Sequence, residues 1–424
     1  MSSRIVLPGP LLGRITAPPS KSYTHRGAVL AHLAGRRFVV ENPLEAEDTR
    51  ATRQGLRALG AEIELRAGTW SFRPASPPRP RRGRVVRCGS SGTTLRLLLG
   101  LAALDPAPTV ITGSAELARR PVAPLVAALR AHGARLRVVR TDGSFRVRVQ
   151  GPLEAGSYAV QSSESSQYAS SLLFVLSQLS APSTLRLTGR PVSQPYFGAT
   201  LAVLRAHGIA VQKRGPHWEV PAPIRPTGSR FAVTGDASSA AILWCGAAIS
   251  GGSVEVRAID TRWPQADLAV LDLLRHAGAS VRQHASGIRV EAADRRPFRF
   301  DFDPCPDLLP LGGVLAAYSP GESTLSGGAH AARKESDRPR ATMALARALG
   351  ATVRRHAGRI LIRGGIRPAS LHFRPPPDHR VVMATAVASL GLARPSRIAA
   401  CESVGKSYPG FWEDLGQLSS GRSA

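Results

Sequence analysis

The sequence of 424 residues is long enough for two or three domains of ordinary size. Hydrophobic residues make up 43% and charged residues 20%, which is typical of a globular chain and excludes a disordered one. The net charge of +27 would suit a polyanionic partner, but the basic residues are spread along the chain with few aromatic residues beside them. Composition therefore favours a folded protein over a dedicated nucleic-acid binder.

Cysteine usage and hydropathy narrow the class further. Cys88, Cys245, Cys305 and Cys401 share no spacing typical of a metal site or a disulfide framework. No uninterrupted apolar stretch reaches the roughly 20 residues of a membrane helix. The strand-like segment 5–7 leaves no room for a targeting peptide. We expect a cytoplasmic protein with no metal and no membrane partner.

From the N-terminus onward, a helix-ending pattern of arginine, two further residues and glycine recurs. Its glycines lie 70 to 75 residues apart, at Gly60, Gly133, Gly208, Gly278 and Gly350. Glycine just after a helix, with arginine in the last turn, is a common C-terminal stop. We expect a strand to begin near each of Ile63, Leu136, Val211, Val281 and Val353.

Small polar residues begin apolar helices with the same period. They are Ser20, Ser90, Ser165, Asp236, Asp307 and Asp378. Serine and aspartate are good N-caps, and the helices expected at 93–104, 166–179 and 237–249 are apolar on nearly every side, which predicts burial. Each of six repeats would hold one internal helix, one amphipathic helix and several short strands. The predicted fold class is α/β with outer sheets and internal helices.

Six repeats are more than one hydrophobic core normally holds, so we predict two inside-out α/β domains of three repeats each. The Pro/Gly-rich segment 221–228 is the expected crossing between them. The sixth repeat lacks a tail, and we expect segment 3–14 to complete it. The predicted domains are 15–228, and 1–14 together with 229–424.

Two features of the basic residues stand out. The dense arginine cluster at Arg79, Arg81, Arg82, Arg84 and Arg87 lies among prolines, which favours an exposed loop, with an anion contact as the alternative. Only four of the 56 basic residues are lysines. A lysine kept in such a chain indicates a need for a compact ammonium group. Lys213 lies in a polar turn, which leaves Lys21, Lys334 and Lys406 as candidates.

The predicted helix starts also carry groups that suit anions. A helix N-terminus offers unpaired N–H groups and a partial positive charge. Hydroxyl or basic side chains accompany four starts, in segments 19–26, 89–96, 163–167 and 378–380. Each alone would be an ordinary cap, but their common period predicts an anion site where the helix starts converge between the domains.

The set of motifs resembles the shikimate branch of the enolpyruvyl transferase family, over about residues 15–415. The motifs are Ser20-Lys21-Ser22 with Arg26, Gly92-Thr93 with Arg96, Arg120-Pro121, Ser165-Ser166-Gln167, Ser193 with Pro195-Tyr196, Gly235 to Ser239, Asp307, Lys334 to Arg338, Asp378-His379-Arg380 and Lys406. The family's fold is two inside-out domains of three units each, which the repeats predict independently.

The resemblance implies transfer of the enolpyruvyl group of phosphoenolpyruvate to the 5-hydroxyl of shikimate 3-phosphate, with release of phosphate, in chorismate and aromatic amino acid biosynthesis. It implies no cofactor and a monomer. Residues expected to bind phosphoenolpyruvate are Lys21, Gly92, Arg120, Gln167, Arg338, Arg380 and Lys406. Those expected to bind shikimate 3-phosphate are Lys21, Ser22, Arg26, Ser165, Ser166, Gln167, Ser193, Tyr196, Asp307 and Lys334.

The resemblance also implies catalytic roles for Asp307, Glu335 and Lys21. Asp307 is expected to take the proton of the attacking hydroxyl. Glu335 is expected to protonate the methylene carbon and later to help remove that proton. Outside the family, Asp307 would be read as an N-cap, and Lys334 with Glu335 as a solvated pair.

Several alternatives stay open. Ser90 and His330 stand where the family commonly has asparagine, so a paralogue with another cyclitol or sugar acceptor is one of them. The sister enzyme that uses UDP-N-acetylglucosamine usually has a reactive cysteine in the loop corresponding to 113–120, and this sequence has none there. An inactive family member is another alternative. The different-class alternative is an arginine-rich nucleic-acid binder, although we expect no nucleic-acid partner for the main function.

Overall fold

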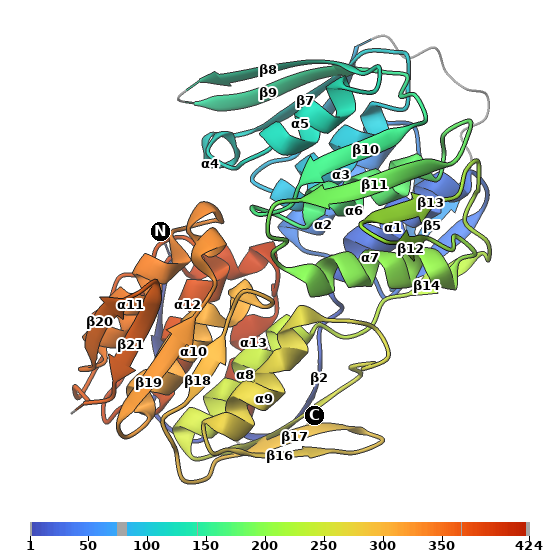
Figure 1. Ribbon diagram of the computed structural model, residues 1–424. Helices are drawn as coiled ribbons and strands as arrows, with labels where there is room; N and C mark the ends of the chain where they lie inside the picture. Colours follow the sequence, from blue (N-terminus) through green and yellow to red (C-terminus); the bar gives the residue numbers. More distant parts are fainter. Residues whose placement is uncertain (1, 74–82, 142, 366, 421–424) are drawn as a thin grey trace. The chain divides into compact units, whose positions relative to one another are not determined.

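The computed structural model describes residues 2–73, 83–141, 143–365 and 367–420 (Figure 1). Contacts divide the chain into two compact units. The N-terminal unit is Pro19–Thr234 with Arg262–Pro264, and the C-terminal unit is the described part of Met1–Pro18, Gly235–Thr261 and Gln265–Ala424. Arg79, Arg81 and Arg82 of the predicted cluster lie outside the described residues.

The N-terminal unit has three four-stranded sheets. Its strands are β3 (Phe38–Glu41), β4 (Glu62–Arg66), β5 (Thr69–Arg73), β6 (Arg84–Arg87), β7 (Thr109–Ser114), β8 (Arg135–Thr141), β9 (Ser144–Gln150), β10 (Ser157–Gln161), β11 (Ser183–Thr188), β12 (Gln212–Arg214), β13 (His217–Val220) and β14 (Arg230–Ala232). They are ordered β14-β3-β5-β4, β6-β7-β9-β8 and β10-β11-β13-β12.

Within the described part of this unit, seven helices accompany the sheets. They are α1 (Lys21–Ala34), α2 (Glu47–Ala58), α3 (Gly92–Ala102), α4 (Ala115–Ala118), α5 (Ala123–Arg130), α6 (Gln167–Leu176) and α7 (Gln194–Ala206). Helices α1, α3 and α6 are buried along most of their length, and α3 packs on both others. The core of this unit therefore lies around these three helices.

The C-terminal unit repeats this plan. Its strands are β1 (Ser3–Val6), β2 (Leu12–Thr16), β15 (Ser253–Arg257), β16 (Ser280–Gln283), β17 (Gly287–Glu291), β18 (Arg299–Asp301), β19 (Glu322–Ser326), β20 (Thr352–His356), β21 (Arg359–Arg363) and β22 (Ser396–Ala399). They form the sheets β2-β15-β17-β16, β18-β19-β21-β20 and β1-β22.

The helices of this unit are α8 (Ala237–Ser250), α9 (Val270–His276), α10 (Leu309–Tyr318), α11 (Arg338–Ala348), α12 (His379–Leu390) and α13 (Phe411–Ser419). Short 3-10 helices are η1 (Ala266–Ala269), η2 (Pro306–Leu308), η3 (Ala329–Arg333) and η4 (Cys401–Lys406). Helices α8, α10 and α12 pack on one another, and α10 and α12 are buried throughout. The predicted α/β class with internal helices is confirmed.

All five four-stranded sheets share one pattern. The first strand runs parallel to the second, and the third and fourth form an antiparallel hairpin beside it. The strands before α1 and α8 are exchanged, because β2 pairs with β15 and β14 pairs with β3. The chain therefore crosses between the units at Pro18–Pro19 and Thr234–Gly235, a little beyond the expected segment 221–228.

The prediction that segment 3–14 completes the sixth repeat is correct for β1 but not for β2. Strand β1 pairs with β22 of the sixth repeat, as expected. Strand β2 starts at Leu12 and instead completes the sheet of the fourth repeat, since Ile15 pairs with Val256.

The predicted helix stops are confirmed. Gly60, Gly133, Gly208, Gly278 and Gly350 all have positive φ, between 80 and 114°. Such a backbone favours glycine and ends each helix before the next strand.

Three of the predicted caps need correction. The hydroxyl of Ser91, not Ser90, accepts the N–H of Thr94 at 3.2 Å, because Ser90 lies in a turn closed by the bond from Ser91 N–H to Cys88 O at 2.9 Å. Helix α6 begins after Ser166, while the Ser165 hydroxyl accepts the N–H of Gln167. Asp307 lies within η2, because Pro306 starts a 3-10 turn ahead of α10.

Candidate active site

Four segments of the C-terminal unit bring a group of charged side chains together. Asp307 comes from η2, Lys334 and Glu335 follow η3, Arg338 begins α11, and Arg380 lies in the first turn of α12. Two caps fix the helix starts: Asp337 accepts the N–H of Arg340 at 3.0 Å, and Asp378 accepts that of Arg380 at 2.9 Å.

Asp307 is the centre of this group. Its Oδ1 accepts hydrogen bonds from Lys334 Nζ and from Arg338 Nη1, both at 2.6 Å. Arg380 Nε reaches its Oδ2 at 3.3 Å. Burial alone would raise the pKa of Asp307, but these three cations hold that pKa well below its usual range. Asp307 is therefore a partly buried carboxylate that stays ionised.

Arg338 links Asp307 to two more carboxylates. Its Nη2 donates to Glu335 Oε2 at 2.8 Å, and its Nε donates to Asp378 Oδ2 at 2.8 Å. The Arg338 side chain is 1% exposed. Burial would lower its pKa, but Asp378, Asp307 and Glu335 raise it well above the usual value. These bonds engage Nε, Nη1 and Nη2 and hold the guanidinium in a fixed position between the three carboxylates.

Sequence reasoning missed Asp267, which lies in η1 and is 2% exposed. Ser238, in the first turn of α8, donates its hydroxyl to Asp267 Oδ2. Burial raises the pKa of Asp267 to about 6, and the charge of Asp307 adds to that effect. Gln265, two residues before Asp267, also contacts the start of α8: its Nε2 donates to Gly235 O and its Oε1 accepts the N–H of Ala237.

The N-terminal unit holds the other predicted residues. Lys21 starts α1 and donates to Asp48 Oδ2 at 3.1 Å. Arg26 is buried and donates to the Ser22 hydroxyl, to Thr200 Oγ1 at 2.9 Å and to Tyr196 O at 2.6 Å. Burial lowers the pKa of Arg26 to about 10, which leaves the group charged at neutral pH.

Gln167 joins two helices of this unit. Its Oε1 accepts from Arg96 Nη1 at 2.6 Å, and its Nε2 donates to Thr93 Oγ1 at 3.0 Å. The Arg120 guanidinium lies against Gly92, where a Cβ would come 2.7 Å from Arg120 Cζ. Only glycine leaves room for this guanidinium beside the first turn of α3.

The structure thus forms two clusters from the predicted residues, one in each unit. Asp307, Lys334, Glu335, Arg338 and Arg380 contact one another in the C-terminal unit. Lys406, at the end of η4, lies in the same unit. Ser193 precedes α7 with a φ of 53°, in the N-terminal unit with Ser165 and Ser166.

The two departures from the family pattern differ in surroundings. The side chain of His330 is 7% exposed and lies 3.8 Å from Asp303 Oδ1. Burial, with the charge of Lys334, lowers its pKa to about 4, so the imidazole is neutral near pH 7. Ser90 is half-buried in the turn before α3.

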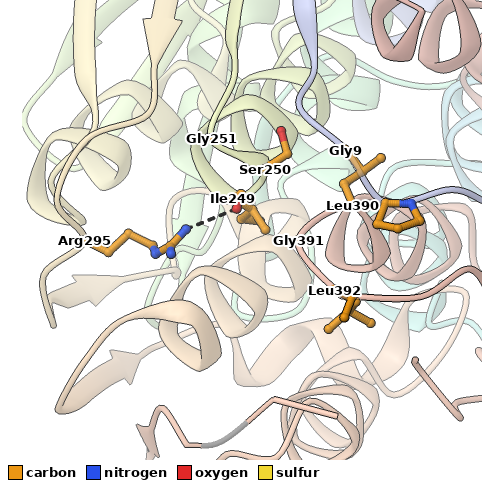
Figure 2. Close-up of a pocket in the computed structure, with 10 residues that line it drawn as sticks. Gly9, Ile249, Ser250, Gly251, Arg295, Leu390, Gly391 and Leu392 are labelled. Atoms are coloured by element: carbon orange, nitrogen blue, oxygen red, sulfur yellow. Dashed lines mark hydrogen bonds between the residues drawn. The ribbon is translucent and has the colours of Figure 1, made fainter. Parts of the chain in front are cut away.

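The C-terminal unit also has a pocket of about 500 Å³ that does not include the charged cluster around Asp307 (Figure 2). It opens at the C-terminal ends of α8 and α12, where Arg295 donates to Ile249 O at 3.1 Å. Helix α12 has 12 residues and is thus about 18 Å long, and Asp378 and Arg380 lie at its other end. This pocket is separate from the charged cluster.

A partly buried carboxylate whose pKa is shifted by three cations near helix starts is a candidate functional site. A family model described as EPSP synthase (3-phosphoshikimate 1-carboxyvinyltransferase) matches residues 6–415. The chain belongs to the EPSP synthase family.

Individual relatives of this chain carry the name of the same family. The 3-phosphoshikimate 1-carboxyvinyltransferase of Aeropyrum pernix is 40% identical over 418 residues, which cover 98% of this chain and 95% of that protein. The protein of the same name from Thermococcus kodakarensis is 37% identical over 409 residues, covering 96% and 97%. A solved EPSP synthase structure from Acinetobacter baumannii, 24% identical, has a TM-score of 0.81 and covers 99% of this chain and 98% of that one. It shares the fold. Among the described residues, no helix is long and apolar enough to span a membrane.

Proposed function

We propose that this chain transfers the enolpyruvyl group of phosphoenolpyruvate to the 5-hydroxyl of shikimate 3-phosphate and releases phosphate. The product is 5-enolpyruvylshikimate 3-phosphate, an intermediate of chorismate and aromatic amino acid biosynthesis. The observation that carries the proposal is the ionised Asp307 among Lys334, Arg338 and Arg380, in a member of the EPSP synthase family.

Phosphoenolpyruvate carries its carboxylate and its phosphate on the same carbon, C2, which is the carbon that reacts. Arginine side chains can bind both groups through paired hydrogen bonds to their oxygens. We assign Arg338 and Arg380 to phosphoenolpyruvate from the C-terminal unit, with Lys406. Lys21, Gly92, Arg120 and Gln167 are the proposed contacts from the N-terminal unit. The packing of Arg120 on Gly92 supports this assignment, since it places a guanidinium beside a helix start.

Shikimate 3-phosphate would be bound mainly by hydroxyl and basic groups of the N-terminal unit. Ser165, Ser166 and Ser193, with Tyr196 nearby, are the proposed phosphate contacts, and Ser22 with Arg26 the carboxylate contacts. The bonds of Arg26 to Ser22 and Tyr196 O support the second assignment, because they hold the guanidinium in one orientation. Lys21, Gln167, Asp307 and Lys334 complete the set.

The reaction is an addition followed by an elimination. A proton goes to the methylene carbon of phosphoenolpyruvate, and the acceptor oxygen attacks C2 while Asp307 takes the hydroxyl proton. Loss of a methyl proton then expels phosphate and restores the double bond. We assign the carbon proton transfers to Glu335, which Arg338 holds at 2.8 Å. A base must be ionised before attack, and the low pKa of Asp307 meets that need.

The acceptor is tested by phosphate release from phosphoenolpyruvate with shikimate 3-phosphate, shikimate or UDP-N-acetylglucosamine. We expect release only with shikimate 3-phosphate. Release with another acceptor would show a paralogue whose acceptor pocket differs, with Ser90 and His330 as the first positions to examine. No release with any acceptor, from folded protein, would contradict the proposal.

We further propose that the protein acts as a monomer in the cytoplasm. Family membership supports both statements. Size-exclusion chromatography with light scattering tests the first, and a dimer mass would contradict it. Fractionation of the source cells tests the second.

A further inference from the structure

The sheet β6-β7-β9-β8 has an inner and an outer face of different chemistry. Val86, Ile111, Val147 and Leu136 are buried on the inner face, where α4 and α5 pack (Figure 1). Because side chains alternate along a strand, the neighbours of these residues point to the other side. Five exposed arginines lie there, and we call them the arginine face: Arg87, Arg135, Arg137, Arg146 and Arg148.

The four strands that carry the arginine face contain no acidic residue. Their sequences are RVVR, TVITGS, RLRVVRT and SFRVRVQ. Within the described ranges, the structure gives none of the five guanidinium groups an ion pair. All five side chains are exposed.

The other four-stranded sheets differ in this respect. Glu64 pairs with Arg66 and Arg73 at 3.0 and 2.9 Å, and Glu255 pairs with Arg257 and Arg289 at 3.0 and 2.8 Å. Two further pairs, Arg354 with Glu322 and Arg214 with Glu219, lie on the remaining sheets. A general preference of the chain for arginine does not explain why only this sheet lacks its glutamates.

The arrangement is unfavourable for an isolated sheet. Arg137 on β8 lies directly opposite Arg148 on β9, and like charges in that relation are destabilising. A bound polyanion would remove this repulsion. The five charges lie on one face of the sheet, with about 4.8 Å between neighbouring strands and about 6.7 Å between alternate residues of one strand. Planar guanidinium forks suit phosphate oxygens in particular.

We infer that the arginine face binds the phosphate backbone of a nucleic-acid duplex, independently of the sequence of that duplex and of the proposed enolpyruvyl transfer. A single strand is the weaker match, because single-strand sites add aromatic side chains on which bases stack. The outer face between the arginines has Val85, Val110 and Thr112 instead. Contacts to phosphate alone give binding that is strongly salt-dependent and carries no sequence preference.

The test is fluorescence anisotropy with a 20-base-pair DNA duplex of random sequence, an RNA duplex of the same length, the single strands, and a poly-glutamate peptide, at several salt concentrations. We expect the protein to bind both duplexes. A plot of the logarithm of the binding constant against the logarithm of the salt concentration is expected to have a slope of about −4 to −5. Each of the five arginines that neutralises a phosphate contributes about −0.9 to this slope.

Two double variants distinguish duplex binding by the arginine face from binding that depends only on the net charge of the protein. Arg137→Gln with Arg148→Gln removes two charges from the face and is expected to weaken duplex binding at least tenfold and to reduce the slope by about 2. Arg66→Gln with Arg73→Gln removes two charges from another sheet and is expected to leave both values nearly unchanged. Phosphate release by both variants is expected to match the parent, since none of these residues belongs to the proposed active site. The thermal stability of Arg137→Gln with Arg148→Gln is expected to equal or exceed that of the parent, because the two substitutions remove a like-charge pair.

Three results would overturn the inference. Equal losses in the two double variants would assign binding to total charge. Tighter binding of single strands than of duplexes would contradict a backbone contact without stacking. Stronger binding of poly-glutamate than of duplex would indicate an acidic protein partner instead.

Discussion

Asp307 shows how a carboxylate can be largely removed from solvent and still stay ionised. Lys334, Arg338 and Arg380 together outweigh the cost of its burial. Replacement by asparagine keeps the size of the side chain but removes the proton acceptor. We expect Asp307→Asn to lower kcat for phosphate release by about 10² to 10⁴-fold. Circular dichroism would confirm that the variant is folded.

The matched control is Asp272→Asn. Asp272 also bonds an arginine, Arg275 at 2.7 Å, but its side chain is 67% exposed. We expect normal turnover from this variant. Near-normal turnover of Asp307→Asn would contradict the assignment of the base.

Lys21 tests the argument from lysine scarcity. It is partly buried and bonded to Asp48, whereas Lys213 is exposed and lies over the ring of Trp218. We expect Lys21→Ala to abolish measurable turnover and Lys213→Ala to leave kcat/KM unchanged. Equal activity of the two variants in steady-state assays would show that Lys21 is not part of the site.

The raised pKa of Asp267 predicts how the free energy of unfolding depends on pH. Its pKa is raised to about 6 in the folded protein, so folding favours its protonated form. Its favourable contribution is complete below the ordinary carboxyl pKa near 4 and is lost as pH rises through 6. Asp267→Asn mimics the protonated form. The variant is expected to gain up to about 3 kcal/mol over the parent at pH 8 and little at pH 4.

Urea unfolding at the two pH values measures this difference. An identical effect of the substitution at pH 4 and pH 8 would contradict a raised pKa. Sequence reasoning missed Asp267 because no motif surrounds it, and its burial depends on how η1 packs against α8.

At the scale of elements, close helix packing depends on glycine. A Cβ on Gly100 of α3 would lie 2.3 Å from Ser171 Oγ and 3.3 Å from Val175 Cγ1 of α6. The Ser171 hydroxyl also donates to Arg96 O at 2.7 Å. We expect Gly100→Ala to destabilise the protein by about 1 to 3 kcal/mol in chemical denaturation.

Gly416 in α13 is the matched control. A Cβ there meets nothing within 4 Å, so Gly416→Ala is expected to stabilise the helix by about 0.5 to 1 kcal/mol. Destabilisation of similar size at both positions would show that the α3–α6 contact is not the cause.

The elements themselves were largely predictable. Glycine stops such as Gly133 are local, because positive φ depends on one residue. Cap positions were less certain, since Ser90 and Ser91 offer the same hydroxyl and only the turn geometry selects Ser91. The 3-10 turn at Asp307 could not be predicted, because it depends on how η2 packs before α10.

At the scale of the whole molecule, the repeats predicted the fold class, but not which strands pair. The exchange of β2 and β14 between repeats depends on pairing with strands far away in the sequence, since β2 pairs with β15 and β14 with β3. The site could be predicted by resemblance, because motifs fix residue order. The contacts of Asp307 with three cations could not, because they join segments up to 73 positions apart.

The most direct test of the proposed reaction is turnover of phosphoenolpyruvate and shikimate 3-phosphate in D₂O, with the product analysed by mass spectrometry. Addition and elimination pass a solvent deuteron onto the methylene carbon. We predict release of one phosphate per product and deuterium in the enolpyruvyl methylene group. Absence of product, or product formed without deuterium, would contradict transfer by this route.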